Sequence, residues 1–403
     1  TENLAGRGIV TQARVDAGRK WEDHGLTWLG LVGMTDPLRE GMQQVIADLH
    51  RAGIRTVMIT GDQSATAYAV GKSLGLSGDE PLRILDSTQL DRLPQKLREA
   101  LADETHVFAR VSPRHKLEIV QALQRRGYVV AMTGDGVNDG PALKAADVGV
   151  AMGGAGQEVA RSLADVVLED DRLDTMKTAI VQGRTIYANI RKALHFLLAT
   201  NFSEIEVMLT TIALGLRPPL TPMQLLWINL ITDVFPGLAL ALEAPEPGTL
   251  EQPPRDPREP VIRAAELKNM ALESAVISTG TLASYGWGLL RYGASPSASS
   301  LPFTTLTLAQ LLHAELCRSE QAGLGMGGRP PNKYLDTALG LSLFAQAGTL
   351  LVPPLRRLLG LGPIGFLDLP VIAAGAFGPL LVNDWIKKRR IAAADSGAQQ
   401  EDH

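Results

Sequence analysis

Thr133-Gly134-Asp135-Gly136-Val137-Asn138-Asp139 is the most informative stretch of this 403-residue chain. It follows the apolar run Tyr128 to Met132, a pattern typical of a buried strand that ends in a polar loop punctuated by glycine. The loop offers two carboxylates, from Asp135 and Asp139, and the amide of Asn138. Oxygen ligands suit Mg²⁺, a hard cation that is commonly shared with a phosphate. The loop therefore predicts a site for Mg²⁺ and a phosphate group.

A second loop, Thr60-Gly61-Asp62, repeats this pattern after the apolar run Ile54 to Ile59. Ligands of open parallel α/β sheets bind at the carboxyl ends of the strands. Two such loops predict an α/β domain whose ligand site lies at that edge of its sheet.

Composition limits the other classes of function. The formal net charge is -4 and 20% of the residues are charged, which gives no reason to expect a nucleic acid as partner. The one cysteine, Cys317, excludes an internal disulfide and a multi-cysteine metal site, and we expect it to pack as a small apolar residue. The chain opens on Thr1 without a signal peptide, so we expect a piece of a longer product.

The second half of the chain contains six long stretches that are almost free of charge. They are Leu194 to Gly215, Pro222 to Leu242, Ala271 to Leu290, Thr304 to Cys317, Leu335 to Val352 and Leu367 to Ile386. A helix needs roughly 17 to 25 residues to cross hydrocarbon, and only the fourth stretch is short. The regular series predicts six membrane spans rather than the buried helices of a soluble protein.

Basic residues indicate how these spans are oriented. Arg191 and Lys192 precede the first span, and Lys387 to Arg390 follow the last. Between the second and third spans lie Arg255, Arg258, Arg263 and Lys268. The positive-inside tendency places all three groups, the preceding soluble domain and both termini in the cytoplasm. Arg356 and Arg357 fall on the opposite side and are an exception.

Polar residues inside the first two spans form a second group of interest. Asn201 and Glu204 are three residues apart, and Asn229, Thr232 and Asp233 follow the i, i+3, i+4 spacing of one helix face. Carboxylates at membrane depth are costly and mark an ion or substrate pathway. A hydrogen-bonded helix contact would explain Asn201 alone, but not the two carboxylates together.

Pro236 adds a backbone argument for an ion site. Its ring and missing N–H free the carbonyl of Thr232 from the helical ladder, and such irregular backbone survives in a membrane where it lines a cavity. The proline-rich link Arg217 to Pro222 predicts a tight hairpin between the two spans. Oxygen ligands from both helices suit Ca²⁺, with Mn²⁺, Na⁺ and protons left open.

Five motifs lie along the chain: Asp36-Pro37-Leu38-Arg39, Met58 to Asp62, Phe108 to Lys116, Thr133 to Asp139 with Pro141-Ala142-Leu143, and Gln224 to Asp233. In these motifs the chain resembles the P-type ATPases, most closely their calcium-pump branch. The motifs occur in the family's order, and the likeness covers the chain up to about Pro247 and, more loosely, the last four spans.

The resemblance implies a haloacid-dehalogenase-like (Rossmann-like) α/β phosphorylation domain followed by a transmembrane helical bundle of about six spans. The implied divisions are the end of the nucleotide-binding domain at 1–35, the phosphorylation domain at 36–175, a cytoplasmic stalk at 176–193, the spans at 194–388, and a disordered tail at 389–403.

The resemblance also implies roles for individual residues. Those for phosphoryl transfer are Thr60, Lys116, Asp135, Asn138 and Asp139, with Asp135 as the Mg²⁺ ligand. Those for contact with ATP are Thr60, Gly61, Asp62, Arg110, Lys116 and Asn138. Those for the transported cation are Asn201, Glu204, Asn229, Thr232, Asp233 and Glu320. Glu320 matches loosely, and a surface glutamate at a span end is an equal alternative.

The family's phosphorylated aspartate lies in an Asp-Lys-Thr-Gly-Thr string, which these 403 residues do not contain. Two hypotheses follow. The chain is the C-terminal part of an ATP-driven cation pump that works with the actuator domain, the nucleotide domain and the first four spans, or it is a truncated pump that binds cations or a partner without turnover. A soluble phosphatase fused to unrelated spans explains less, because it leaves Glu204 and Asp233 without a role.

Overall fold

The computed structural model describes residues 37–134, 137–153, 158–170, 172–320, 322–325 and 330–401. These residues form two compact units. The first holds Val57–Ser112 and the described residues before Asp48, and the second holds Asp48–Thr56 and the chain from Pro113 onward. The predicted end of a nucleotide-binding domain, 1–35, lies outside the described residues.

The first unit is built on three parallel strands in the order β1-β3-β2. They are β1 (Met58–Ile59), β2 (Ile84–Asp86) and β3 (Val107–Ala109). The helices are α2 (Met42–Arg51), which continues into the second unit, α3 (Ser64–Leu74), α4 (Ser87–Leu90) and α5 (Gln95–Glu104). The central strand β3 is buried throughout, and its Val107 and Ala109 pack against Ile46 and Ala67 of the neighbouring helices.

The soluble part of the second unit has the same plan, with strands in the parallel order β4-β5-β6. The strands are β4 (Ala131–Gly134), β5 (Val148–Met152) and β6 (Val166–Leu168), and the helices are α6 (Pro113–Arg125), α7 (Gly140–Ala145) and α8 (Glu158–Leu163). The strand predicted to begin at Tyr128 begins at Ala131 instead, and the side chains of Tyr128 and Val129 are exposed. The α/β architecture with parallel strands is confirmed.

Helix α9 (Thr175–Ala213) runs without a break through the predicted stalk and the first predicted span. Its Arg184 guanidinium donates to the backbone oxygens of Thr249 (3.1 Å), Leu250 (2.7 Å), Gln252 (2.6 Å) and Ala52 (2.7 Å). One arginine thus joins the stalk to a loop of the membrane part and to the end of α2.

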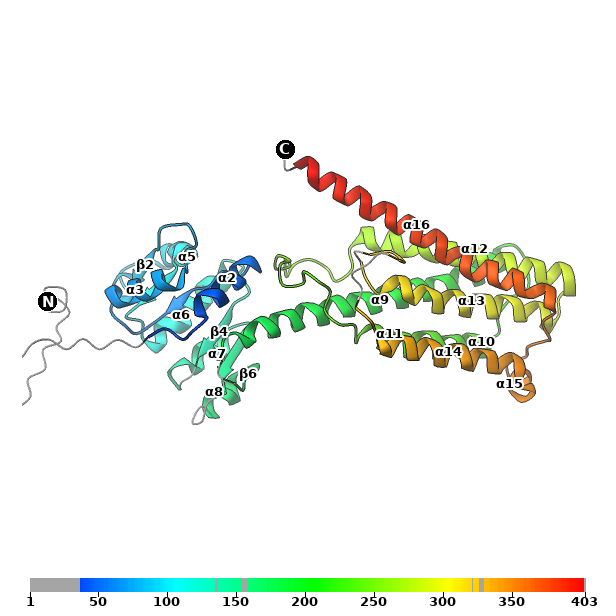
Figure 1. The fold of residues 1–403 in the computed structure, drawn as a ribbon, viewed down its shortest axis with the longest axis horizontal. Coiled ribbons are helices and arrows are strands. Elements are labelled where there is room, and N and C mark those ends of the chain that lie inside the picture. The colour runs from blue at the N-terminus through cyan, green and yellow to red at the C-terminus, as the bar shows by residue number, and fades with distance from the viewer. Residues whose placement is uncertain are drawn as a thin grey trace, which may run out of the picture. The chain divides into compact units, whose positions relative to one another are not determined.

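The membrane part consists of helices at all six predicted stretches (Figure 1). After α9 come α10 (Pro222–Asn229), a π-helical segment (Leu230–Val234), α11 (Phe235–Leu240), α12 (Ala264–Tyr292), α13 (Pro296–Cys317), α14 (Lys333–Leu351), α15 (Pro353–Leu358) and α16 (Leu369–Glu401). Within the residues that the structure describes, three segments are long and apolar enough to cross a membrane: Thr175–Ala213, Pro222–Leu240 and Phe366–Ala393. Spanning by α12, α13 and α14 stays a prediction.

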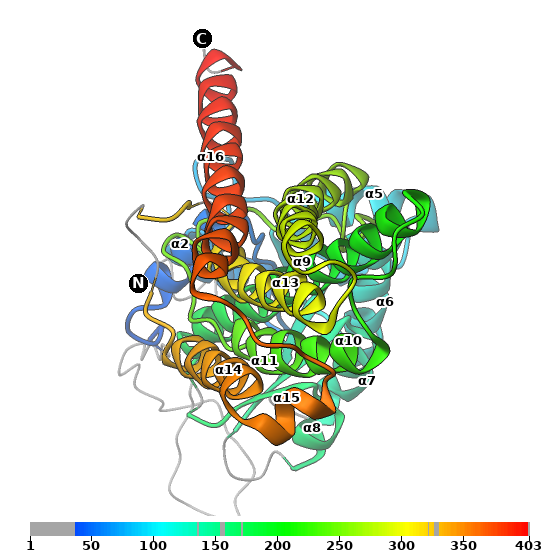
Figure 2. The same ribbon diagram turned by 90° about the vertical axis from the view of Figure 1, so that its right-hand side faces the viewer.

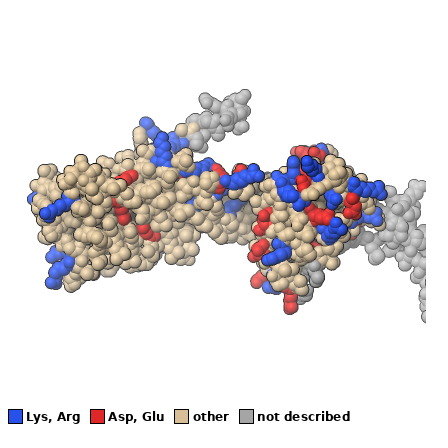
Figure 3. Space-filling model, turned by 180° about the vertical axis from the view of Figure 1, so that it is seen from behind, with Lys and Arg blue, Asp and Glu red and all other residues tan. Residues whose placement is uncertain are grey.

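Helix α12 packs against α9, α13 and α16, as the two views of the bundle show (Figures 1 and 2). Its Gly280 lies against Gly375 of α16 so closely that a Cβ on Gly280 would collide with the Gly375 carbonyl oxygen. Small residues at helix contacts are typical of membrane proteins. On the face shown in Figure 3, acidic and basic atoms are dense over the soluble part and sparse over the helical bundle.

The expectation of a disordered tail at 389–403 is wrong for its described part, because α16 continues to Glu401. The tail contains Ala392, Ala393 and Ala394, which follow the basic run Lys387 to Arg390 and Ile391. Alanine is the strongest helix former, and a helix that is already nucleated extends at little cost.

Replacing Arg184 by alanine will weaken the attachment of the stalk, because four carbonyl oxygens lose a charged donor. Hydrogen bonds to charged groups contribute about 1.5–3 kcal/mol each, so we expect a lower thermal unfolding temperature and faster amide exchange at residues 249–252. Gln182→Ala, an exposed neighbour on the same helix, is the matched control. Equal behaviour of the two variants would show that the arginine does not hold the stalk.

Candidate functional site

The loop Thr60-Gly61-Asp62 lies at the carboxyl end of β1, as predicted. Its shape is set by local hydrogen bonds: the Asp62 amide donates to Thr60 Oγ1 (3.1 Å), and Thr60 Oγ1 donates to Asp62 Oδ2 (3.0 Å). The segment after β3 holds it from the other side, since the amides of Arg110 and Val111 donate to the backbone oxygens of Asp62 (2.9 Å) and Thr60 (3.0 Å). The structure therefore brings Thr60, Asp62 and Arg110 together.

Arg110 is strained. Its φ of 56° lies in the left-handed region, and it is the one non-glycine residue with a positive φ in the part of the chain that the structure describes. Backbone strain of this kind clusters at functional sites, where the surrounding structure holds it.

Asp86 is a third polar group at this edge, and sequence reasoning missed it. It ends β2 and caps α4 through the Thr88 amide (3.0 Å), while the Ser64 hydroxyl donates to its Oδ2 (2.7 Å). The hydrogen bonds from Ser64 and Thr88 lower the pKa of Asp86, and the charge of Arg110 adds to this. An acidic residue at the end of a strand was the available signal.

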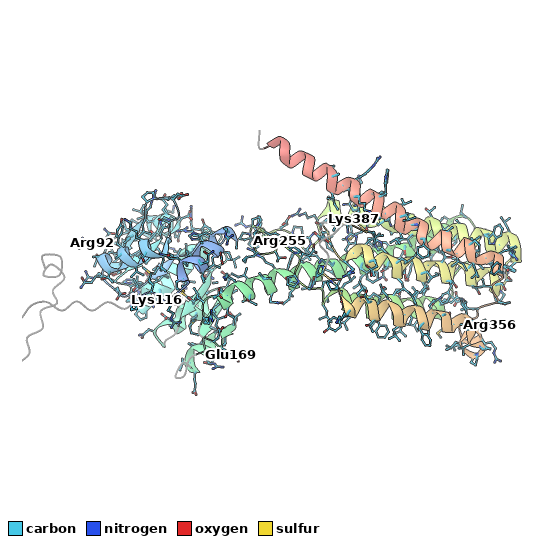
Figure 4. All side chains as sticks on the ribbon, viewed as in Figure 1. Arg92, Lys116, Glu169, Arg255, Arg356 and Lys387 are labelled. Atoms are coloured by element: carbon cyan, nitrogen blue, oxygen red, sulfur yellow. The ribbon has the colours of Figure 1, made fainter. Side chains whose placement is uncertain are left out.

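In the second unit, Lys116 Nζ lies 2.5 Å from Asp139 Oδ1. Lys116 projects from α6 (Figure 4), whose Val120 and Leu123 are buried. Asp139 ends a 3-10 turn after β4 and folds back over Gly134, where a Cβ would lie 2.7 Å from the Asp139 Cβ. Only glycine leaves room for this return of the loop.

Asp135, the Mg²⁺ ligand predicted in this loop, lies outside the described residues. The Mg²⁺ site therefore stays a prediction. Asn138 is exposed, and Asp139 is buried. What the described residues supply is an ammonium group next to the loop, held by a carboxylate. Such a group neutralises phosphoryl oxygens when it is positioned in advance.

The membrane part brings together all five polar residues predicted on the first two spans. Asp233 accepts hydrogen bonds from Asn201 Nδ2 (3.1 Å), Thr232 Oγ1 (3.2 Å) and Thr200 Oγ1 (3.4 Å). The Asn229 amide nitrogen, in the orientation that makes it a donor, lies 3.0 and 3.2 Å from the two carboxylate oxygens of Glu204. Asn201 and Glu204 come from α9, and the other three from α10 and the π-helical segment.

Gln310 of α13 completes this group and was missed by the sequence reasoning. Its Nε2 donates to the Thr200 carbonyl (3.1 Å), Ser203 Oγ (3.3 Å) and Glu204 Oε1 (3.2 Å). Gln310 is fully buried, and its Oε1 has no hydrogen-bond partner among the described residues. A glutamine within an apolar span was the signal that could have found it.

The backbone around Thr232 and Asp233 is irregular, as expected from the presence of Pro236. Residues Leu230–Val234 form a π-helix that includes Thr232 and Asp233, and Pro236 follows at the start of α11. Single π-helical turns inside α-helices are frequent at functional sites.

Glu320 is not brought to this group. Its side chain is 55% exposed and pairs with Arg191 at 3.3 Å. A different carboxylate of α9, Glu206, faces α12 instead and accepts from Ser274 (2.7 Å) and Ser278 (2.8 Å). Glu204 and Glu206 thus point to different neighbours although they are two residues apart.

The donor set fits a hard cation. It consists of two carboxylates with amide and hydroxyl oxygens, largely buried, and includes the unpartnered Oε1 of Gln310. Calcium takes six to eight oxygen ligands in flexible geometry. A cation here would give the Gln310 oxygen a partner and would neutralise the two carboxylates.

Comparison with known proteins supports both halves of this description. Residues 217–389 match the family model described as "Cation transporting ATPase, C-terminus", and residues 7–147 match "haloacid dehalogenase-like hydrolase".

Curated relatives cover most of the chain. It is 38% identical to calcium-transporting ATPase 1 of Bacillus cereus over 91% of its length, and 42% identical to the calcium-transporting ATPase of Bacillus subtilis over 82%. It is 34% identical to human calcium-transporting ATPase type 2C member 2 over 90%. The matches cover 43%, 37% and 38% of those relatives, so the chain spans about two fifths of their length.

The strain at Arg110 leads to a stability prediction. Arg110→Gly will raise the free energy of unfolding relative to Arg110→Ala, because a left-handed backbone costs an L-residue about 1–2 kcal/mol and glycine nothing. Both variants lack the guanidinium, so the comparison isolates the backbone. Thermal unfolding of the full chain in detergent measures the difference, and equal stability of the two would contradict a strained Arg110.

Proposed function

The chain belongs to the calcium-transporting branch of the P-type ATPases, and we propose from this premise that it forms part of an ATP-driven pump for Ca²⁺. In this proposal its membrane helices hold the transported cation. Its soluble part contributes to Mg²⁺-dependent formation and hydrolysis of an aspartyl phosphate. The lipid membrane and the remaining part of the pump are its partners, with the soluble part and both termini in the cytoplasm.

The observation that carries the proposal is the oxygen network around Glu204 and Asp233. Two carboxylates share one buried region with Asn201, Asn229 and Thr232, at a π-helical break in the second span. Intramembrane carboxylates are rare and mark ion pathways. The all-oxygen donor set favours Ca²⁺ over softer metals.

Coupling between the two parts rests on α9. The helix begins at Thr175 beside the soluble part and carries Asn201 and Glu204 in the membrane. A displacement of its soluble end therefore reaches the two ligands through one rigid element, and Arg184 fixes that end to its surroundings. Transport needs such a link between phosphoryl transfer and ion affinity.

For phosphoryl transfer, we assign Asp135 to hold Mg²⁺, supported by Asn138 and Asp139, and Lys116 to neutralise the phosphoryl oxygens. Thr60, Gly61, Asp62 and Arg110 would contact phosphate and nucleotide. Bound Mg²⁺ would supply charge neutralisation and orientation to the ATP phosphates. The phosphorylated aspartate would come from outside these 403 residues, which contain no Asp-Lys-Thr-Gly-Thr string.

The ion site is tested by calorimetric titration of the purified full chain with Ca²⁺ in detergent. We expect Glu204→Gln and Asp233→Asn each to weaken binding about tenfold or more, which corresponds to at least ~1.4 kcal/mol, because each removes a charged ligand. Glu206→Gln is the matched control, since it changes the same residue type on the same helix but faces Ser274 and Ser278. Unchanged Ca²⁺ affinity in both test variants would refute the assignment.

The phosphoryl-transfer role is tested by limited proteolysis of the soluble part. Mg²⁺ together with orthovanadate, a phosphate analogue, should slow cleavage of the wild-type chain, because the bound pair would occupy the site that we propose at Asp135. Asp135→Asn should lose this protection, while Asp79→Asn, which changes an exposed carboxylate, should keep it. Equal protection of wild type and Asp135→Asn would favour a truncated pump that binds cations without turnover.

A further inference from the structure

A second cluster of metal-ligating side chains lies on the membrane helices apart from Glu204 and Asp233. It consists of His195 on α9 with His313 and Cys317 on α13. One ligand atom of each lies within 4.8 Å of the others. His313 and Cys317 are one helical turn apart, so both face α9, and they are only 2% and 7% exposed.

His313 lacks hydrogen-bond partners. Neither of its ring nitrogens has a partner among the described residues, and the nearest carboxylate oxygen, Oε2 of Glu273, is 3.6 Å away. A buried polar group without a partner costs about 1–3 kcal/mol. This histidine is therefore placed where a bound metal ion would satisfy it.

Glu273 of α12 has the position that supporting carboxylates take in metal sites. Its Oε2 lies 2.6 Å from Nε2 of His195, and Arg390 contacts its other oxygen at 3.4 Å. Metal-binding histidines commonly donate one ring N–H to a carboxylate, which fixes the ring and leaves the other nitrogen for the metal. The pair His195–Glu273 matches this arrangement.

We propose that His195, His313 and Cys317 form a binding site for a borderline divalent metal ion of the Zn²⁺ class, with Glu273 orienting His195. Thiolate and imidazole ligands suit such ions and not Ca²⁺, so the site differs in chemistry from the oxygen network. Tetrahedral Zn²⁺ needs ligand atoms about 3.3 to 3.8 Å apart, and side-chain shifts of roughly 1 Å close the observed spacing. The Cys317 thiol gives its proton to solvent when the metal binds.

A cavity adjoins two of the three proposed ligands, His195 and Cys317. The cavity has a volume of about 190 Å³ and is lined by His195, Glu273, Cys317 and the basic residues Lys192 and Lys387. Lys387 lies on α16, toward the end of the bundle opposite to Arg356 (Figure 4). Three protein ligands with one open position are typical of sites that admit water or a small exogenous ligand.

A metal at this site joins α9 directly to α13, and through Glu273 to α12. Helix α9 also carries Asn201 and Glu204, at positions further along the same helix. The ion therefore restrains the movement of the helix that contributes two of the proposed transport ligands. A metal bound here would regulate transport by limiting that movement.

The site is tested by adding Co²⁺ and Zn²⁺ to the full chain in detergent. We expect one equivalent of Co²⁺ to give a thiolate-to-metal absorption band and Zn²⁺ to displace it. Cys317→Ser should abolish the band, and His313→Gln should weaken Zn²⁺ binding about tenfold or more, as loss of a ligand requires. His115→Gln, which changes a histidine of the soluble helix α6, should leave Zn²⁺ binding unchanged.

A second measurement uses the unmodified chain, so it tests the site even where a variant fails to fold. Cys317 is the only cysteine, so alkylation by a small maleimide reports on it alone. Zn²⁺ should slow this labelling at least tenfold and a chelator should restore it, whereas Ca²⁺ should have no effect. An unchanged labelling rate with Zn²⁺, or full Zn²⁺ affinity in both Cys317→Ser and His313→Gln, overturns the proposal.

Discussion

The placement of two carboxylates among apolar helices, with Glu204 buried and Asp233 half-buried, is the constraint on which the membrane part of this protein depends. A charged group removed from water is costly unless donors or a cation compensate it. The fold supplies Asn201, Thr232 and Thr200 to Asp233, and Asn229 and Gln310 to Glu204. These contacts require α9, α10 and α13 to meet at one depth, and the π-helical turn at Leu230–Val234 lies where they meet.

The long helix α9 connects the group around Glu204 and Asp233 to the soluble part. One uninterrupted element carries Arg184, His195, Asn201 and Glu204, each of which faces a different neighbour. A rigid helix with anchors along its length transmits displacement better than a chain of loops. Helix α9 therefore contributes ligands to two groups, the oxygen network and the proposed site of His195, His313 and Cys317. The ligands of the two groups suit different metals.

The sequence was most informative where a short motif carries its own geometry. Glycine-punctuated loops after apolar runs located Thr60-Gly61-Asp62 and Asp139, and helical spacing grouped Asn201 with Glu204 and Asn229 with Asp233. Contacts between segments far apart in the sequence were harder to predict, because no spacing along the chain encodes them. Gln310 comes from α13, more than a hundred residues after Glu204, and Glu320 is held by Arg191 instead of the ion group. The left-handed backbone of Arg110 was equally hidden, since tertiary hydrogen bonds to Thr60 and Asp62 impose it.

The most direct test of the ion site is an experimental structure of the full chain with Mn²⁺, whose anomalous scattering locates the ion without ambiguity. We expect an anomalous peak between the side chains of Glu204 and Asp233, with the Gln310 or Asn229 amide oxygen turned toward it. The absence of a peak between these two side chains, or Mn²⁺ found only at the protein surface, would contradict the assignment of the ion site.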